Sequence, residues 1–222
     1  MKLSVLALAL GVTFSGSAFA TANAWDTTAP WAGSTLSQFA EWTDIESIND
    51  STPDVFTNAT ANLTLNNPAQ SGGYSNGSNI YGLGIFAGAV GMQFTTTLGG
   101  GDVGGLYDVY LRIGTLGSVP NITATLNGAS ANASEVNTIG PITIVMGGES
   151  AEQEVYWKWA NVTGASLYTF TFSASAPHMS LDQVALATVA VTAVPEPETY
   201  GMMGFGLGLL TLATRRARKN KA

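Results

Sequence analysis

The only histidine of the chain, His178, is the first residue to consider for chemistry, because imidazole is the commonest general base at neutral pH. It follows Pro177 in a turn-forming stretch, and Asp182 stands four residues later. A Ser-His-Asp triad would need a serine held on a sharp turn and brought to His178 by the fold. A zinc site built on several histidines is excluded by the count. The pattern favours a turn residue over a catalytic base.

Three acidic residues, Glu149, Glu152 and Glu154, raise the question of glycoside hydrolysis, which uses two carboxylates on either side of the scissile bond. The spacing of the three residues fits such a pair no better than it fits a solvated, charged loop. The loop interpretation needs no special geometry and is favoured. The sequence therefore assigns no catalytic residue, and we expect the protein not to be an enzyme.

The segment from Glu154 to Trp159 is rich in aromatic residues and alternates like a strand. Aromatic rings stack on sugars through the same apolar faces that fill protein cores. Tyr156, Trp157 and Trp159 are therefore candidate glycan contacts. Because Trp157 and Trp159 share a face with Val155, the alternation favours the core for both tryptophans and leaves Tyr156 the more accessible ring.

Calcium is the remaining ligand to consider, because acidic exported sandwiches can use Ca²⁺ to tie loops through carboxylates and backbone carbonyls. No EF-hand spacing is present, so the sequence assigns no metal ligand and no cofactor. A structural Ca²⁺ stays an alternative. Its candidate ligands are Asp26, Asp44, Glu46, Asp102 and Asp182.

Short alternating segments separated by glycine, proline and asparagine must position these residues. They predict an all-β fold, an antiparallel β-sandwich that is jelly-roll-like, because no convincing amphipathic helix lies between them. Leu36, Phe39, Trp42 and Ile45 recur every three residues, which fits a short helix or an irregular lead-in, and residues 42–45 fit an extended edge equally well. The expected strands are 80–86, 90–98, 106–113, 122–126, 142–146, 154–159, 167–174 and 179–192.

The charge of the expected domain, residues 21–193, excludes some partners. Thirteen acidic residues face only two basic ones, Arg112 and Lys158, which gives a net charge of −11. A domain with two cations cannot offer the basic surface that phosphate backbones need, so nucleic-acid binding is excluded. Cysteine is absent, which removes disulfides and thiolate chemistry.

The first twenty residues, 1–20, have the organisation of a signal peptide. Lys2 provides the positive region, an apolar stretch follows, and Ala18-Phe19-Ala20 matches the small-residue cleavage pattern. Cleavage after Ala24 is the alternative, because Ala22-Asn23-Ala24 has the same form. We therefore expect export through the inner membrane.

The segment 194–222 has three parts in a fixed order. Val194, Pro195, Glu196 and Pro197 form a rigid, extended element, because proline fixes φ and lacks an N–H. An apolar stretch at about 200–214 follows, and then a basic tail, 215–222. An apolar stretch that ends in cations is a stop-transfer pattern whose basic side stays in the cytoplasm. The stop-transfer cations are Arg215, Arg216, Arg218 and Lys219.

This tripartite segment closely resembles the PEP-CTERM sorting signal of Gram-negative bacteria. The resemblance implies processing by exosortase, a membrane protease-transpeptidase that recognises the Pro-Glu-Pro element and removes the tail. It also implies a single transmembrane helix at about 200–214 that anchors the protein before processing. The body is only loosely similar to jelly-roll carbohydrate-binding modules, over 167–172 and 179–184.

These features together predict where the protein goes more firmly than what it does. We expect an exported, non-enzymatic β-sandwich that is transiently anchored in the inner membrane and then reaches the cell surface or the extracellular exopolysaccharide matrix. A structural or adhesive role is favoured there, with exopolysaccharide as the expected partner. The alternatives are a carbohydrate-binding module and, less favoured, a polysaccharide-acting enzyme.

Overall fold

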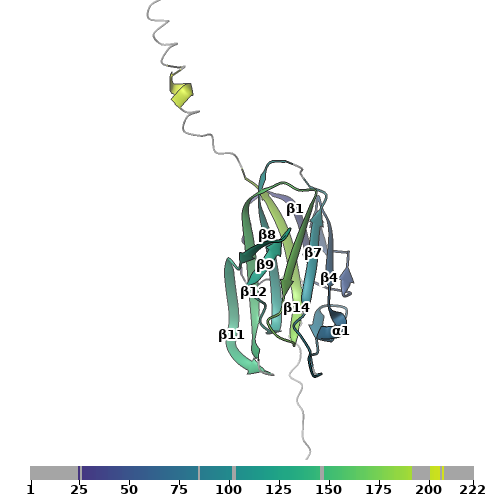
Figure 1. Ribbon diagram of the computed structural model, residues 1–222. Coiled ribbons are helices and arrows are strands. Elements are labelled where there is room, and N and C mark those ends of the chain that lie inside the picture. The colour runs from purple at the N-terminus through teal and green to yellow at the C-terminus, as the bar shows by residue number, and fades with distance from the viewer. Residues whose placement is uncertain are drawn as a thin grey trace, which may run out of the picture.

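Two antiparallel sheets lie face to face and form a β-sandwich, as the alternation of the sequence predicts (Figure 1). The computed structural model describes residues 25, 27–84, 86–101, 104–145, 148–191, 201–205 and 207. The expected signal peptide, both of its cleavage sites and the Pro-Glu-Pro element lie outside these residues. So do the four stop-transfer cations and most of the segment 200–214.

The larger sheet has a six-strand path with two short strands beside it. The path runs β11 (Glu135–Val145), β12 (Gly148–Thr163), β8 (Leu106–Ser118), β14 (Met179–Ala190), β1 (Leu36–Trp42) and β3 (Val55–Thr57). The short strands are β5 (Gly73–Ser75) and β6 (Ile80–Gly82), and β6 pairs with β14. The last strand, β14, thus lies between β8 and β1 at the centre of this sheet.

The smaller sheet packs against the larger one and has six strands. In order these are β10 (Ala129–Asn132), β9 (Thr123–Leu126), β13 (Leu167–Ser173), β7 (Gln93–Gly99), β4 (Thr60–Leu65) and β2 (Asn49–Asp50). The chain crosses repeatedly from one sheet to the other. After β7 it does so between β7 and β8, β8 and β9, β10 and β11, β12 and β13, and β13 and β14. These crossings bring segments that are distant in the sequence together at the two ends of the sandwich.

The core between the sheets is built by the inward side chains of each strand. Tyr107, Val109, Leu111 and Ile113 of β8 all belong to it, as their period of two predicts. Phe94 of β7 stacks on Phe172 of β13 with 4.9 Å between ring centres. Other large, fully buried members are Trp42, Leu63, Ile80, Leu98, Trp157 and Phe170.

A second apolar layer covers the outer face of the larger sheet. Trp31 packs edge-on against Phe39 of β1 and Tyr110 of β8, at 5.9 and 5.7 Å between ring centres. The segment before β1 therefore covers this face. It also explains why β1 was ambiguous in the sequence, because a strand buried on both faces loses its alternation. The helix alternative for Leu36–Ile45 is wrong.

Each of the eight expected strands has a counterpart in the structure, but several bounds differ. The strand β7 begins at Gln93, and β8 and β12 are longer than the expected 106–113 and 154–159. The expected strand 80–86 ends at Gly82, because Gly84 has φ +51 and approaches Pro177 closely. The expected strand 142–146 starts earlier, at Glu135, and interrupts its pairing between Ile139 and Thr143. One four-residue helix, α1 (Pro68–Ser71), follows β4 at one end of the sandwich (Figure 1).

Residues 201–205 and 207 are helical and exposed. Within the described parts of the chain, no helix has both the length and the apolar character to cross a bilayer.

Candidate functional site

His178 lies in the turn between β13 and β14 in a left-handed conformation with φ +72. Its backbone carbonyl accepts the N–H of Ser118 at 3.1 Å. The carboxylate of Asp182 accepts instead from the hydroxyl of Ser180 at 2.6 Å and from the amide of Asn79 at 3.1 Å. His178 therefore serves the turn through its backbone, and its contacts do not build a catalytic triad.

Sequence reasoning overlooked one G-x-S-x-G stretch, at 73–77. Ser75 stands at its centre, at the end of β5, where β5 turns into β6. Its hydroxyl donates to the carbonyl of Ile45 at 2.8 Å and accepts the N–H of Gly77 at 3.0 Å. A nucleophile elbow needs a strand-to-helix turn that exposes the serine, so this hairpin does not provide one.

The three glutamates of the expected charged loop do not form a pair of catalytic carboxylates. Glu154 is buried and pairs with Arg112 of β8, with 3.3 Å between Nη2 and Oε2. Glu149 and Glu152 are exposed near the start of the same strand, β12. Since β12 alternates, Glu149 lies on the opposite face from Glu152 and Glu154.

The ion pair forms the centre of a buried polar cluster on the outer face of the larger sheet. Arg112 Nη2 donates to the carbonyl of Thr27 at 2.8 Å, and the Thr27 N–H donates to Glu154 at 3.0 Å. The guanidinium lies 4.0 Å from the ring centre of Trp25, whose indole N–H donates to Glu41. Burial lowers the pKa of Arg112, and Glu154 opposes that shift. The cluster fastens the N-terminal segment to the sheet.

The aromatic residues of β12 are divided between the core and the surface. Trp157 is 0% exposed and donates its indole N–H to the carbonyl of Ile122 at 2.8 Å. Trp159 is 8% exposed and donates to the carbonyl of Ala129 at 3.1 Å. Both rings pack between the sheets, as the alternation favoured, so neither can stack on a sugar. Trp157 and Trp159 are therefore wrong as glycan contacts.

Tyr156 remains a candidate, because it is half-buried on the outer face of β12. Burial raises the pKa of its hydroxyl, and the hydrogen-bonded carboxylate of Glu135 on β11 raises it further. The ring is thus accessible on one side and fixed through its hydroxyl on the other.

The candidate calcium ligands are not brought together among the described residues, where no group of three or more acidic or histidine side chains could hold a metal. Asp44 and Glu46 are exposed, and Asp26 and Asp102 lie outside the described residues. Two carboxylates that sequence reasoning did not single out tie this loop instead. Asp54 accepts the N–H groups of Thr43 and Asp44 at 2.7 and 2.9 Å, and Asp50 accepts that of Glu46 at 2.9 Å.

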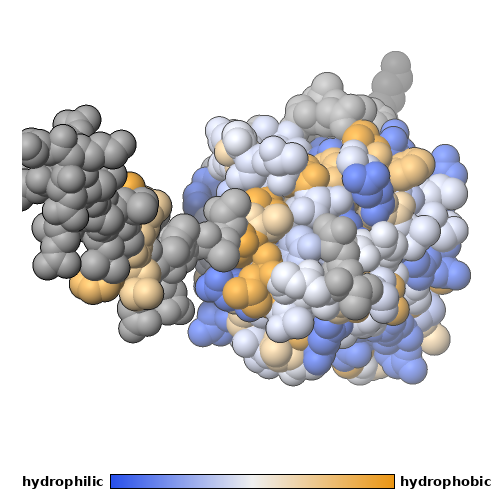
Figure 2. Space-filling model, turned by 90° about the horizontal axis from the view of Figure 1, so that it is seen from above, coloured by the Kyte–Doolittle hydropathy of each residue, from blue (hydrophilic) through white to orange (hydrophobic). Residues whose placement is uncertain are grey.

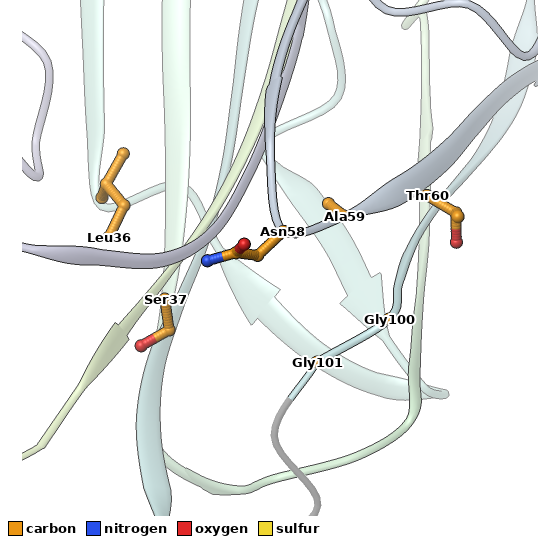
Figure 3. A pocket seen from close by; sticks show the side chains of 7 residues that line it. All are labelled: Leu36, Ser37, Asn58, Ala59, Thr60, Gly100 and Gly101. Atoms are coloured by element: carbon orange, nitrogen blue, oxygen red, sulfur yellow. The ribbon is translucent and has the colours of Figure 1, made fainter.

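One hollow of about 550 Å³ lies at the end of the sandwich where β1 begins and β7 ends (Figure 3). Asn58 has φ +50 in the turn from β3 to β4 and extends its amide towards the start of β1. The hollow offers hydroxyl, amide and peptide groups, and none of the described residues that line it is charged or aromatic. The lining residues are Leu36, Ser37, Asn58, Ala59, Thr60, Gly100 and Gly101.

Beneath this hollow, the side chain of Gln38 is buried at 2% exposure. Its Nε2 has no hydrogen-bond partner among the described residues. Gly101 passes so close that a Cβ at this position would lie 1.7 Å from Gln38 Nε2. Any larger residue at position 101 would therefore require the end of the Gln38 side chain to move.

The comparison with protein families matches residues 193–219 to the PEP-CTERM protein-sorting motif. The match begins two residues after Val191, where the described domain ends. No curated protein matches the chain. The motif implies export, membrane anchoring before processing, and processing by exosortase. By its sorting motif at residues 193–219, the chain is a PEP-CTERM protein.

Proposed function

We propose that this PEP-CTERM protein is a non-catalytic β-sandwich that reaches the cell surface or the extracellular polysaccharide matrix and has a structural or adhesive role there. The observation that carries this proposal is the sorting motif at residues 193–219. The expected signal peptide at 1–20 supports it, because export is the first step of such a route.

The contacts of the polar residues support the non-catalytic part of the proposal. Arg112 and Lys158, the two basic residues of the domain, both form ion pairs, with Glu154 and Asp108. Asp50 and Asp54 hold backbone N–H groups. A catalytic site would instead bring a nucleophile or two carboxylates together around a space for substrate.

A carbohydrate-binding function is the second candidate, and one observation favours it. The hollow beside Asn58 and Thr60 is lined by neutral hydroxyl, amide and peptide groups, which pair with sugar hydroxyls. The half-buried ring of Tyr156 is a separate surface on which a sugar could stack.

Replacing Pro195-Glu196-Pro197 by three alanines tests the route. We expect export to be unchanged and the variant to stay in the inner-membrane fraction at its signal-cleaved, otherwise full mass. The matched control replaces Thr199, which follows the element, by alanine and should be processed normally. If the triple-alanine protein still reached the surface with the same shortened C-terminus, this element would not be the recognition site.

Glycan-array binding separates the structural role from the carbohydrate-binding one. If the second candidate is right, Asn58→Gly, which keeps the left-handed conformation at φ +50, or Tyr156→Ala should lower binding at least about tenfold while the protein stays folded. Asn62→Ala, on β4 outside the hollow, is the control and should bind normally. Binding to no glycan would dismiss the second candidate and leave the structural role.

A further inference from the structure

The end of the sandwich from which the sorting motif continues differs in charge from the rest of the domain. At this end the N–H of Val191 donates to the carbonyl of Leu106 at 2.8 Å, and that of Gly100 donates to Ser166 at 3.3 Å. These bonds join the start of β8, the end of β7 and the turn from β12 to β13 beside the last described residue of the domain. We call this surface the motif-proximal end. Its described residues are 36–37, 57–60, 99–101, 104–106, 163–167 and 190–191.

None of these described residues is charged. The nearest charged residues on the strands, Asp108 and Lys158, lie further along and form an ion pair at 2.6 Å. Three further acidic residues lie outside the described residues. They are Asp102, which stands in the sequence between residues 101 and 104 of this end, and Glu196 and Glu198, which follow Val191. Carboxylates are instead found along the strands and towards the opposite end, at Glu41, Asp44, Glu46, Asp50, Asp54, Glu135, Glu149, Glu152, Glu154 and Asp182.

Apolar side chains stand out from the motif-proximal end. Leu106 is 46% exposed and Leu167 is 50% exposed, and Leu36 and Val191 are half-buried nearby. Figure 2 looks down on this end and shows orange and pale residues over much of it, with the strongly hydrophilic residues mainly towards the rim. Exposed apolar side chains also occur elsewhere on the domain, for example at Ile122 and Ile144. Leu106 and Leu167 are distinguished by their place at the end of the sandwich from which the sorting motif continues.

The length of the connecting chain limits what this end can meet. Eight residues, 192–199, separate Val191 from the apolar stretch of the motif. Eight residues span at most about 29 Å even when fully extended. The thirteen residues of β8 alone run about 43 Å along the sandwich. As long as the chain is anchored, the motif-proximal end therefore stays close to the bilayer.

We propose that the motif-proximal end is a membrane-contact surface, which seats Leu106 and Leu167 at the boundary between lipid headgroups and acyl chains while the chain is anchored. Anionic headgroups repel carboxylates, so an end whose described residues carry no charge can approach them more closely than the carboxylate-bearing parts of the domain. Two leucines alone bind a membrane weakly, but the anchor raises their effective concentration and makes a weak contact persist. A lipid boundary suits this surface better than a protein partner, because its described residues offer no charge pattern for a partner to pair with.

The absence of cysteine makes a direct test straightforward. The full chain is placed in 3:1 phosphatidylethanolamine–phosphatidylglycerol vesicles containing doxyl-labelled lipids, and an environment-sensitive fluorophore is attached to a single introduced cysteine. Ser166→Cys reports on the motif-proximal end. Ala69→Cys, on exposed α1, is the control at the opposite end (Figure 1). We expect at least about twofold stronger quenching at position 166, because interfacial apolar side chains insert about 5–10 Å deep, within reach of the doxyl groups.

Leu106→Ser with Leu167→Ser, introduced into the Ser166→Cys chain, should abolish this difference. Ile144→Ser, at a 71% exposed position on β11 away from this end, should leave it unchanged. Unfolding by the double replacement is not expected, since both leucines are exposed, and circular dichroism checks it. Equal quenching at positions 166 and 69 would overturn the proposal. So would shielding of position 166 that appears only when exosortase is added to the vesicles, since the partner would then be the protease.

Discussion

At the scale of single residues, the buried Arg112 is the most consequential charge of the domain. Its guanidinium contacts Glu154, Thr27 and Trp25, so it links β8 and β12 to the N-terminal segment. Removing one member of a buried pair leaves the other charge without compensation. Replacing both members by apolar side chains avoids that cost.

We predict that Arg112→Met lowers the free energy of unfolding by about 3–5 kcal/mol. The double replacement Arg112→Met with Glu154→Leu should lose clearly less, because no buried charge is left over. Urea denaturation of both variants measures the difference. If the single replacement cost less than the double one, Glu154 would not depend on Arg112, and the cluster would not be the fastening that we describe.

The exposed ion pair of Lys158 and Asp108 gives a pH-dependent prediction. The hydrogen bond to Asp108 raises the pKa of Lys158 above its ordinary value. A raised lysine pKa stabilises the fold below the unfolded pKa of about 10.5, and this contribution disappears as the pH rises through the folded pKa. Wild type should therefore lose slightly more stability than Lys158→Met between pH 9 and pH 12.

The difference should stay below about 1 kcal/mol, because exposed pairs are weak. Urea titrations at several pH values measure it. Both proteins are compared in a Tyr156→Phe background, because the pKa of Tyr156 is also raised and is affected by Lys158. A Lys158→Met protein that lost more stability than wild type across this range would contradict the assignment.

At the scale of elements, the crossing of β8 with the turn before β14 depends on a glycine. Gly117 has φ +93, and a Cβ there would lie 2.2 Å from the carbonyl oxygen of His178. Gly128, in the turn from β9 to β10, has φ +84 but nothing within 4 Å of its Cβ position. The two glycines therefore separate the cost of backbone conformation from the cost of a steric clash.

Gly128→Ala should destabilise the protein by about 1 kcal/mol, because only the left-handed conformation penalises the new side chain. Gly117→Ala should lose about 1–3 kcal/mol more, because the His178 carbonyl must also move. Thermal melts monitored by circular dichroism compare them. Equal losses of stability would mean that the His178 carbonyl can move away from the new side chain without a cost in free energy.

The strands also show how much of the fold could be predicted from the sequence. The alternation of residues along β8 and β12 correctly predicted which side chains share a face and placed Trp157 in the core. It did so because the inner face of each strand is consistently apolar and the outer face is more polar. It failed for β1, where Trp31 covers Phe39 on the outer face and Trp42 lies in the core. Apolar side chains on both faces erase the alternation that distinguishes a strand from a helix.

The candidate sites were less readable than the strands, because they depend on contacts between distant segments. Arg112 and Glu154 are 42 residues apart and meet through the register of β8 and β12. The hollow joins the start of β1, the turn at Asn58 and the loop after β7. The sorting motif could be predicted directly from the sequence, because it is a local pattern of consecutive residues that does not depend on the fold.

At the scale of the whole molecule, stability rests on packing and backbone pairing, because the chain has no cysteine. We expect a reducing agent to leave the melting temperature unchanged. We also expect EDTA to leave it unchanged, since no cofactor is assigned. A ligand that binds only the folded state would raise the melting temperature by mass action. A fall with EDTA that added Ca²⁺ reverses would instead establish a structural calcium ion.

We propose that the whole protein is an exported β-sandwich, which its C-terminal motif anchors before processing and which is then released at the surface. Before processing, residues 21–193 should lie outside the cytoplasm and the basic tail 215–222 inside, because clustered cations stay on the cytoplasmic side. The most direct test is mass spectrometry of the mature C-terminus, on protein collected from the surface of native cells. We predict a chain that ends near Pro195–Pro197 and lacks Arg215 to Ala222. Surface protein that still ended at Ala222 would contradict the account.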